Sequence, residues 1–184
     1  MKKEKVLQNA MKKGKRELSV PDRADYFERM IDLADEFFGA NRDPSQISVD
    51  RRVRKTLVRI HPRTMSERRT RRGPVAWGLV IPTTSEIMRR FLGREITERQ
   101  LLTLTPLHER YTSLYLCSAL VLPEFRKKGY AKRLILGAVR DIRRDHPIEV
   151  LFYWSFSGVG SKLAKAIARE TGLPLIRRRR SPSA

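Results

Sequence analysis

The amino-acid sequence predicts an α/β fold in which a mixed β-sheet is flanked by helices. The chain has 184 residues, a length that fits one well-filled domain and is short for two. Forty per cent of the residues are hydrophobic, so a buried core is expected. From residue 111 onward, apolar runs of strand length alternate with stretches of helical periodicity. This order is typical of parallel strands joined by crossover helices.

The first part of the chain is predicted to supply one helix and two strands. Residues 22–38 repeat apolar side chains at helical spacing, which predicts an amphipathic helix. Residues 53–60 and 75–81 have the composition of strands, and the second run stops at Pro82. Between them, residues 63–73 are polar and rich in arginine, which indicates an exposed loop or the tip of a hairpin.

The segment 83–110 is predicted to hold two short helices and no strand. Thr97 and Gln100 have the spacing of a capping box, which marks the start of the second helix. The remainder of the chain is predicted to form strands at 111–122, 149–155 and 173–176, and helices from about 128 to 143 and at 160–171.

The cysteine and histidine content limits the chemistry and the compartment. Cys117 is the only cysteine, so no internal disulfide can form, which points to a reducing, cytoplasmic setting. The three histidines are scattered, and one cysteine cannot complete a thiolate zinc site, so no metal centre is predicted. The N-terminal lysines are not followed by the apolar run of a signal peptide, and no apolar run is long enough to cross a bilayer. We therefore expect a soluble protein.

The net charge of +20 is concentrated in three segments of the chain. Residues 1–16, 50–72 and 177–180 together carry 21 basic and 3 acidic side chains, and the rest of the chain is nearly neutral. Such segments attract polyanions such as RNA, ribosomes or an anionic membrane surface, or they only keep the protein soluble. The expected organisation is a basic arm at 1–20, one domain at 21–176 and a basic tail at 177–184.

A basic turn ahead of a helix is the most informative motif. Residues 119–144 contain a buried strand, a turn at Pro123 and a basic loop that opens a helix. The first N–H groups of a helix are unpaired and lie at the positive end of its dipole, so they bind anions. Gly129 lets the backbone approach a phosphate where a Cβ would clash. The pattern suits a pyrophosphate, with added positive charge from Lys127, Lys128, Lys132 and Arg133.

The run Arg126-Lys127-Lys128-Gly129-Tyr130-Ala131 resembles the R/Q-x-x-G-x-G/A signature of the GNAT superfamily of N-acetyltransferases. The order of elements over 111–176 agrees with that family. The resemblance implies a GNAT-like mixed, twisted sheet in which the amides of this loop hold the pyrophosphate of acetyl-coenzyme A. It further implies that the backbone of Ala119, Leu120 and Val121 binds the pantetheine arm, in a slot that opens towards the strand at 149–155. Ser161 stands where the family usually has asparagine, and we expect it to contact the coenzyme.

The segment 82–110 departs from the usual layout of the family. In that layout, a short turn leads into the fourth strand, which corresponds to 111–122. This chain instead has a helical insert of about thirty residues before the fourth strand. The insert could cover the acceptor side as a lid, or serve as a packing element or dimer contact.

Acetyl transfer to an amine needs a base for the amine and a donor for the oxyanion, and an acid helps the thiolate to leave. The tyrosine that often supplies this acid in the family is replaced by Ala168. Alternatively, the thiolate leaves without an acid, since a thiol pKa of about 8.5 makes it a fair leaving group. The candidate catalytic residues are Ser155, Tyr115 and Glu124, with Ser157, Tyr153, Glu109 and His108 as further candidates.

Two functions follow from the resemblance. The first is an N-acetyltransferase that passes the acetyl group of acetyl-coenzyme A directly to an unidentified amine. The alternative is a catalytically silent, GNAT-like protein that binds acyl-coenzyme A and whose basic arms bind nucleic acid or ribosomes.

Overall fold

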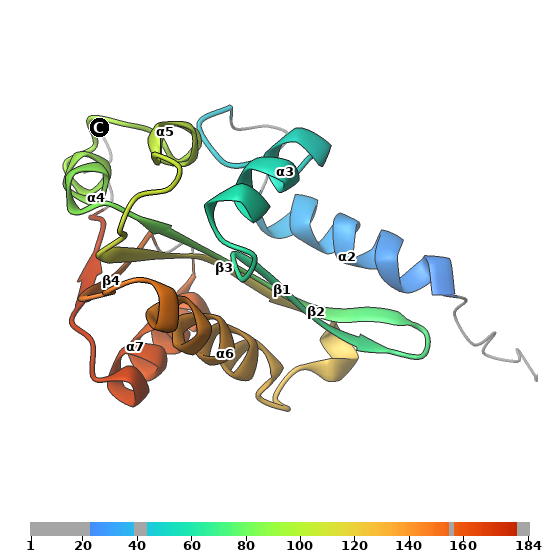
Figure 1. The fold of residues 1–184 in the computed structure, drawn as a ribbon. Coiled ribbons are helices and arrows are strands. Elements are labelled where there is room, and N and C mark those ends of the chain that lie inside the picture. The colour runs from blue at the N-terminus through green and yellow to red at the C-terminus, as the bar shows by residue number, and fades with distance from the viewer. Residues whose placement is uncertain (1–22, 39–43, 155–156, 180–184) are drawn as a thin grey trace, which may run out of the picture.

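The computed structural model describes residues 23–38, 44–154 and 157–179 of the chain (Figure 1). A mixed five-stranded sheet in the order β1-β2-β3-β4-β5 forms the centre of the α/β fold. Helices α2 and α3 cover one face of this sheet, and α6 and α7 cover the other (Figure 1). The expected arm at 1–20 and the last residues of the expected tail lie outside the described residues.

Helix α2 spans Arg23–Phe38, as the apolar spacing of 22–38 predicts. Its buried residues Tyr26, Met30 and Leu33 pack with Val75 and Leu122 in a small hydrophobic cluster. A larger cluster fills the rest of the domain and includes residues from both faces of the sheet.

The prediction of a strand at 53–60 is wrong, because these residues belong to helix α3, Arg51–Ile60. The carboxylate of Asp50 caps the helix by accepting a hydrogen bond of 2.7 Å from the N–H of Val53. Leu57 and Ile60 are buried, and with Val53 they follow the i, i+4, i+7 spacing of a helix. The β-branched residues of the run favoured a strand, but the cap and this spacing outweigh them.

The polar segment 63–73 also differs from its prediction, since most of it forms the edge strand β1, Met65–Thr70. β1 pairs antiparallel with β2, Gly73–Thr83, so only the tip of the expected hairpin is a turn. An edge strand with one solvated side can carry the exposed, charged residues that made this segment look like a loop. Strand β2 runs through Pro82 rather than stopping before it.

The insert forms the two short helices that the sequence predicts, α4 at Ser85–Leu92 and α5 at Glu98–Leu104. The capping box is present: Thr97 Oγ1 accepts from the N–H of Gln100, and the Gln100 side chain accepts from the N–H of Thr97. The insert precedes β3, Ser113–Val121, which is the third strand among the described residues.

The second half of the chain alternates strand and helix as predicted. β3 pairs in parallel with β4, and β4 pairs in parallel with β5. The expected tail starts one residue too early, since β5 extends through Arg177. The elements are the short 3-10 helix η1 (Pro123–Phe125), α6 (Tyr130–Asp145), β4 (Val150–Tyr153), α7 (Gly158–Thr171) and β5 (Leu175–Arg177).

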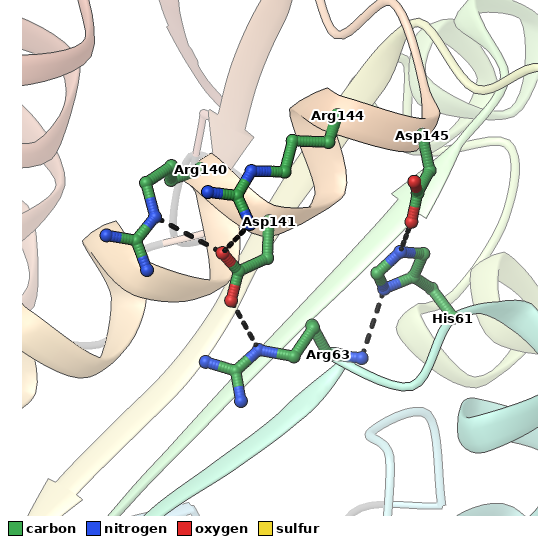
Figure 2. A network of polar contacts seen from close by, with 6 residues as sticks. All are labelled: His61, Arg63, Arg140, Asp141, Arg144 and Asp145. Carbon is green, nitrogen blue, oxygen red and sulfur yellow. Dashed lines mark hydrogen bonds and ion pairs between the residues drawn. The ribbon is translucent and has the colours of Figure 1, made fainter.

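A polar network joins the start of β1 to the end of α6 (Figure 2). The N–H of Arg63 donates to His61 Nδ1 at 3.0 Å, so the ring proton lies on Nε2, which donates to Asp145 Oδ2 at 2.9 Å. Arg63 Nε lies 2.9 Å from Asp141 Oδ2. Desolvation of Asp141 is outweighed by Arg140, Arg63 and Arg144, which hold the pKa of this carboxyl below its ordinary value. The network fixes how the α3–β1 connection meets α6.

His146 next to this network should make stability depend on pH. Its ring lies 4.6 Å from that of Tyr111 and 5.6 Å from that of His61. Burial lowers the pKa of His146 below 6.5, and the charge of Asp145 offsets this effect only in part. The folded state therefore favours the neutral ring, and its stability is lost as the pH falls from about 6.5 through the folded pKa.

We expect the Tm of the unchanged chain to fall relative to that of His146→Gln as the pH is lowered from about 7.5 to 5.5. His108→Asn, at an exposed turn, is the control. An equal fall in His146→Gln and the unchanged chain, measured by thermal unfolding, would contradict the assignment.

Candidate functional site

The loop between η1 and α6 has the backbone of an anion-binding turn. Lys127 and Gly129 both have left-handed backbone conformations, with φ of 62° and 72°. Residues 126–129 are exposed, and Gly129 caps α6 without any side-chain hydrogen bond to its first turn. The first N–H groups of α6 thus have no side-chain cap, and left-handed residues in such a loop let successive N–H groups converge on one anion.

Cationic side chains of the same segment hold this loop in shape. Arg133 Nη2 donates to the carbonyl of Lys128 at 2.7 Å, and Arg126 Nε donates to the carbonyl of Val121 at 3.2 Å. A Cβ at Gly129 would lie 3.1 Å from Arg133 Nη1, so this guanidinium stands directly beside the glycine backbone. The charge of Lys132, in contrast, is paired with Glu170 at 2.7 Å. The loop therefore combines an open backbone with nearby positive charge.

Beside this loop, β3 extends beyond its pairing with β4, because β4 ends at Tyr153. Their parallel pairing ends at Leu116 and Tyr153, whereas β3 continues to Val121. A β-bulge lies at the same point, because Ser118 faces Leu79, Leu116 faces Val80, and Cys117 is the extra residue between them. Beyond the bulge, Ala119, Leu120 and Val121 pair with β2 on one side only, among the described strands. The slot that the resemblance implies would run along their other edge.

A buried carboxyl group lies at the bulge, on the face of the sheet that carries the insert. Glu98, the first residue of α5, is only 5% exposed. Its Oε1 accepts hydrogen bonds from the hydroxyl of Tyr115 at 2.6 Å and from Sγ of Cys117 at 3.5 Å. Its Oε2 accepts from the N–H of Ile47 at 3.0 Å. The insert therefore places one acid against β3 at the point where the pairing of β3 with β4 ends.

Burial sets the protonation of this cluster. Desolvation raises the pKa of Glu98 above 4.5, although Tyr115, Ile47, Cys117 and the charge of Arg178 all act to lower it. Desolvation and the charge of Glu98 raise the pKa values of Tyr115 and Cys117 well above their ordinary values. Both groups thus stay protonated and act as donors to Glu98. A neutral thiol is a poor nucleophile, so the cluster does not favour chemistry at Cys117.

Arg178, which follows β5, packs against the insert near the Glu98 cluster. Its guanidinium lies 4.1 Å from the ring centre of Phe91 and 4.7 Å from that of Trp154. It also lies 3.5 Å from the carbonyl of Ile96 as a hydrogen-bond donor. Residue 178 was expected to belong to a solvated tail, but it packs between the insert and the end of β4. Both aromatic faces stabilise its charge in a partly desolvated position.

The other predicted catalytic residues are not brought together. Ser155 lies outside the described residues. Glu124 is bound by Arg29 through two hydrogen bonds of 2.9 and 3.0 Å, and although desolvation raises its pKa, Arg29 and Arg126 hold it below the ordinary value. Tyr153 is buried in β4, and His108 and Glu109 are exposed ahead of β3.

The predicted coenzyme contact on the last helix lies in the first turn of α7. The N–H of Ser161 donates to the carbonyl of Ser157 at 3.2 Å. The Ser157 hydroxyl caps the helix by accepting a hydrogen bond of 3.0 Å from the N–H of Gly160. Ser157 therefore has a structural role in this arrangement. Ala168 is partly buried against the core and carries no titratable group.

Sequence reasoning missed Glu98. The signal that could have found it is positional, because Glu98 precedes Leu101, Leu102 and Thr105 at the i, i+3, i+4, i+7 spacing of the buried face of α5. A carboxylate on such a face needs partners, and Tyr115 supplies one of them.

The described residues contain no group of three or more His, Cys, Asp or Glu side chains that could hold a metal ion. No helix of the described part is long and apolar enough to cross a membrane.

Comparisons with solved structures give a distant likeness. No family model matches the chain, and no curated protein is similar to it in sequence. An aminoglycoside acetyltransferase from an uncultured soil metagenomic sample, crystallised in complex with trehalose, has a related arrangement with a TM-score of 0.45. It is 14% identical, and the match covers 82% of this chain and 83% of that one.

Proposed function

We propose that this protein is an acetyltransferase, which uses acetyl-coenzyme A as donor and a primary amine as acceptor in a direct transfer. The observation that carries the proposal is the juxtaposition of two features. One is the loop 126–131 at the start of α6, which is exposed at residues 126–129, and the other is the adjacent edge of β3, which has no partner strand among the described residues. The first suits a pyrophosphate, and the second suits an extended, amide-containing arm.

The donor would be held by the backbone and by few side chains. The amides of Lys127, Lys128, Gly129, Tyr130 and Ala131 would bind the pyrophosphate. Arg126, whose N–H donates to the carbonyl of Pro123 at 3.2 Å, would contribute its positive charge. Ala119, Leu120 and Val121 would hydrogen-bond the pantetheine arm through their free edge, as an added strand does. Ser161 would contact the coenzyme from the first turn of α7. The left-handed Gly129, without a Cβ, fits the close approach of a phosphate.

Glu98 is the group best placed to accept a proton from the amine. An alkylammonium ion has no lone pair, so one N–H bond must break before attack, and the proton would pass to a Glu98 oxygen. The free amine then attacks the thioester carbon, the C–S bond breaks, and the amide nitrogen yields its second proton to the thiolate. Tyr115, Cys117 and Ile47 would hold the carboxylate in position, while burial keeps it basic.

Tyr115 is therefore assigned a positioning role rather than that of the departing thiolate's acid, because its hydroxyl already donates to Glu98. Glu124 is assigned to loop support, since both of its oxygens bind Arg29. With Ala168 at the usual acid position, we propose that the thiolate leaves without a dedicated acid.

Calorimetry and a thiol-release assay test the proposal. The chain is titrated with acetyl-coenzyme A, and free thiol is then measured with a polyamine, a lysine-rich peptide and an amino sugar as acceptors. Binding followed by amine-dependent thiol release supports the proposal. Binding without release from any acceptor favours the silent, coenzyme-binding alternative, and a lack of binding contradicts both.

A further inference from the structure

Helix α3 presents a face of positive charge to solvent. Its ten residues include four arginines and one lysine, all exposed, and no acid. At about 100° per residue, Arg51, Arg52, Lys55 and Arg59 fall within roughly a 100° arc, opposite the side that packs on the sheet. This stripe is about 12 Å long, from residue 51 to residue 59.

The charges of this stripe are not neutralised by the side chains that the structure describes. Exposed cations elsewhere are often paired, as Arg29 is with Glu124, Arg69 with Glu67 and Lys132 with Glu170. Among the described residues, no Asp or Glu carboxylate forms an ion pair within 4.0 Å with a cation of the stripe. The stripe therefore keeps its full charge towards solvent.

The stability of the helix accounts only for Arg59, which lies in the last turn where the helix dipole favours positive charge. Arg51 and Arg52 stand in the first turn, which has no acid and where the helix dipole disfavours positive charge. Arg51 with Lys55, and Lys55 with Arg59, are like charges at i, i+4 and repel each other. A local arrangement that works against folding is expected where a site serves binding.

We infer that the exposed face of α3 is a docking surface for the phosphodiester backbone of a nucleic acid. Three of the four stripe residues are arginine, whose planar fork of donors matches phosphate oxygens. The surface belongs to the folded domain and is separate from the terminal arms. The stripe residues are exposed on α3, whereas Glu98 belongs to α5 and its partners Tyr115 and Cys117 belong to β3 (Figure 1).

A membrane surface fits this face less well. A helix that lies in a bilayer interface needs an apolar face to bury in the lipid. The apolar side of α3 is already used, since Leu57 and Ile60 are buried against the domain. Val58 is the one apolar residue of α3 that is strongly exposed, at 51%. A positively charged surface without an exposed apolar side fits the phosphodiester backbone of a nucleic acid better than a lipid bilayer.

Neutralising three cations of the stripe tests the inference. The variant carries Arg52→Gln, Lys55→Gln and Arg59→Gln, and its control carries Lys162→Gln, Lys165→Gln and Arg169→Gln on α7. The control residues are exposed, have the same i, i+3, i+7 spacing and remove the same charge. Binding to a labelled single-stranded RNA of about 20 nucleotides, and to a DNA duplex of equal length, is followed by fluorescence anisotropy between about 50 and 200 mM salt.

The α3 variant should bind about tenfold or more weakly, and the slope of log affinity against log salt should fall by about 2 for the single strand. Its Tm should be unchanged or higher, whereas the α7 control should bind like the original chain. Comparison of the RNA with the duplex identifies the source of the phosphates. Co-sedimentation with vesicles containing phosphatidylserine is measured in parallel. Equal losses in both variants, no loss in the α3 variant, or a loss seen only with the vesicles would each overturn the inference.

Discussion

Gly129→Asp is expected to abolish the binding of acetyl-coenzyme A. The substitution sets a carboxylate where the pyrophosphate would lie, and two like charges at close range repel strongly in a partly desolvated site. A side chain at this position is also strained, because Gly129 has φ of 72° and a Cβ would meet Arg133 Nη1 at 3.1 Å. We expect calorimetry to show at least a 100-fold loss of affinity, equivalent to about 2.7 kcal/mol.

Two controls separate charge from strain. Gly172 caps α7 with φ of 67° and has no atom within 4 Å of a Cβ position, so Gly172→Asp introduces the same left-handed strain away from the loop. It should lower Tm but leave coenzyme affinity intact. Gly129→Ala adds the strain at the loop without the charge and should fall between Gly129→Asp and the original chain. Unchanged affinity in Gly129→Asp would place the coenzyme elsewhere.

Glu98→Gln is expected to lower kcat/KM about 100-fold while acetyl-coenzyme A binds as before. The amide keeps the size of the side chain and one acceptor oxygen, but it cannot take a proton from the ammonium. Glu95→Gln is the matched control, because Glu95 lies in the same insert, is 65% exposed and makes only a long ion pair of 3.8 Å with Arg90. It should retain the kcat/KM of the original chain.

The pH dependence distinguishes a proton acceptor from a structural acid. The ratio of kcat/KM between the original chain and Glu98→Gln cancels the titration of the acceptor amine. This ratio should approach 1 at low pH, where Glu98 is protonated, and rise to its full value as the pH passes the raised pKa of Glu98. A ratio that stays constant with pH would assign Glu98 a structural role only.

The stability of the fold should depend on pH in the opposite sense to the kcat/KM ratio. Because burial raises the pKa of Glu98 above 4.5, the folded state binds a proton that the unfolded state has released. Stability therefore falls as the pH rises from about 4.5 through the folded pKa, and the ionised group is a cost at neutral pH. Glu98→Gln removes that cost, so its Tm at neutral pH should be equal or higher. A strongly lowered Tm would mean that the carboxylate mainly holds the insert in place.

The elements near loop 126–131 could be predicted from the sequence because their signals are local. The strand at 111–122, the glycine at 129 and the helix after it are each marked by apolar runs or by a residue with a distinct conformation. The capping box of Thr97 and Gln100 is equally local, and it located α5 correctly. Such features need no knowledge of the tertiary neighbours.

The errors arose where tertiary context decides. Residues 53–60 contain β-branched residues that favour a strand, yet the Asp50 cap and a buried face produce α3. The polar strand β1 can form only because it lies at the edge of the sheet, and the sequence of β1 does not predict that position. Glu98 meets Tyr115 across 17 residues of chain, and Arg178 meets Phe91 across the whole second half of the domain. Contacts of that range follow from the packing of the fold.

The hydrogen bond from Ile47 to Glu98 has a consequence for the domain as a whole. Ile47 lies three residues before the Asp50 cap of α3, and the N–H of Arg99 donates to the carbonyl of Ser45 at 3.0 Å in the same connection. A ligand that binds α3 and displaces the segment before it would remove the hydrogen bond from the N–H of Ile47 to Glu98. Loss of this donor would raise the pKa of Glu98 further. By thermodynamic linkage, ionisation of Glu98 would then change the affinity of α3 for that ligand by the same factor. Ligand binding at α3 and the ionisation of Glu98 would therefore be coupled through the segment that joins them.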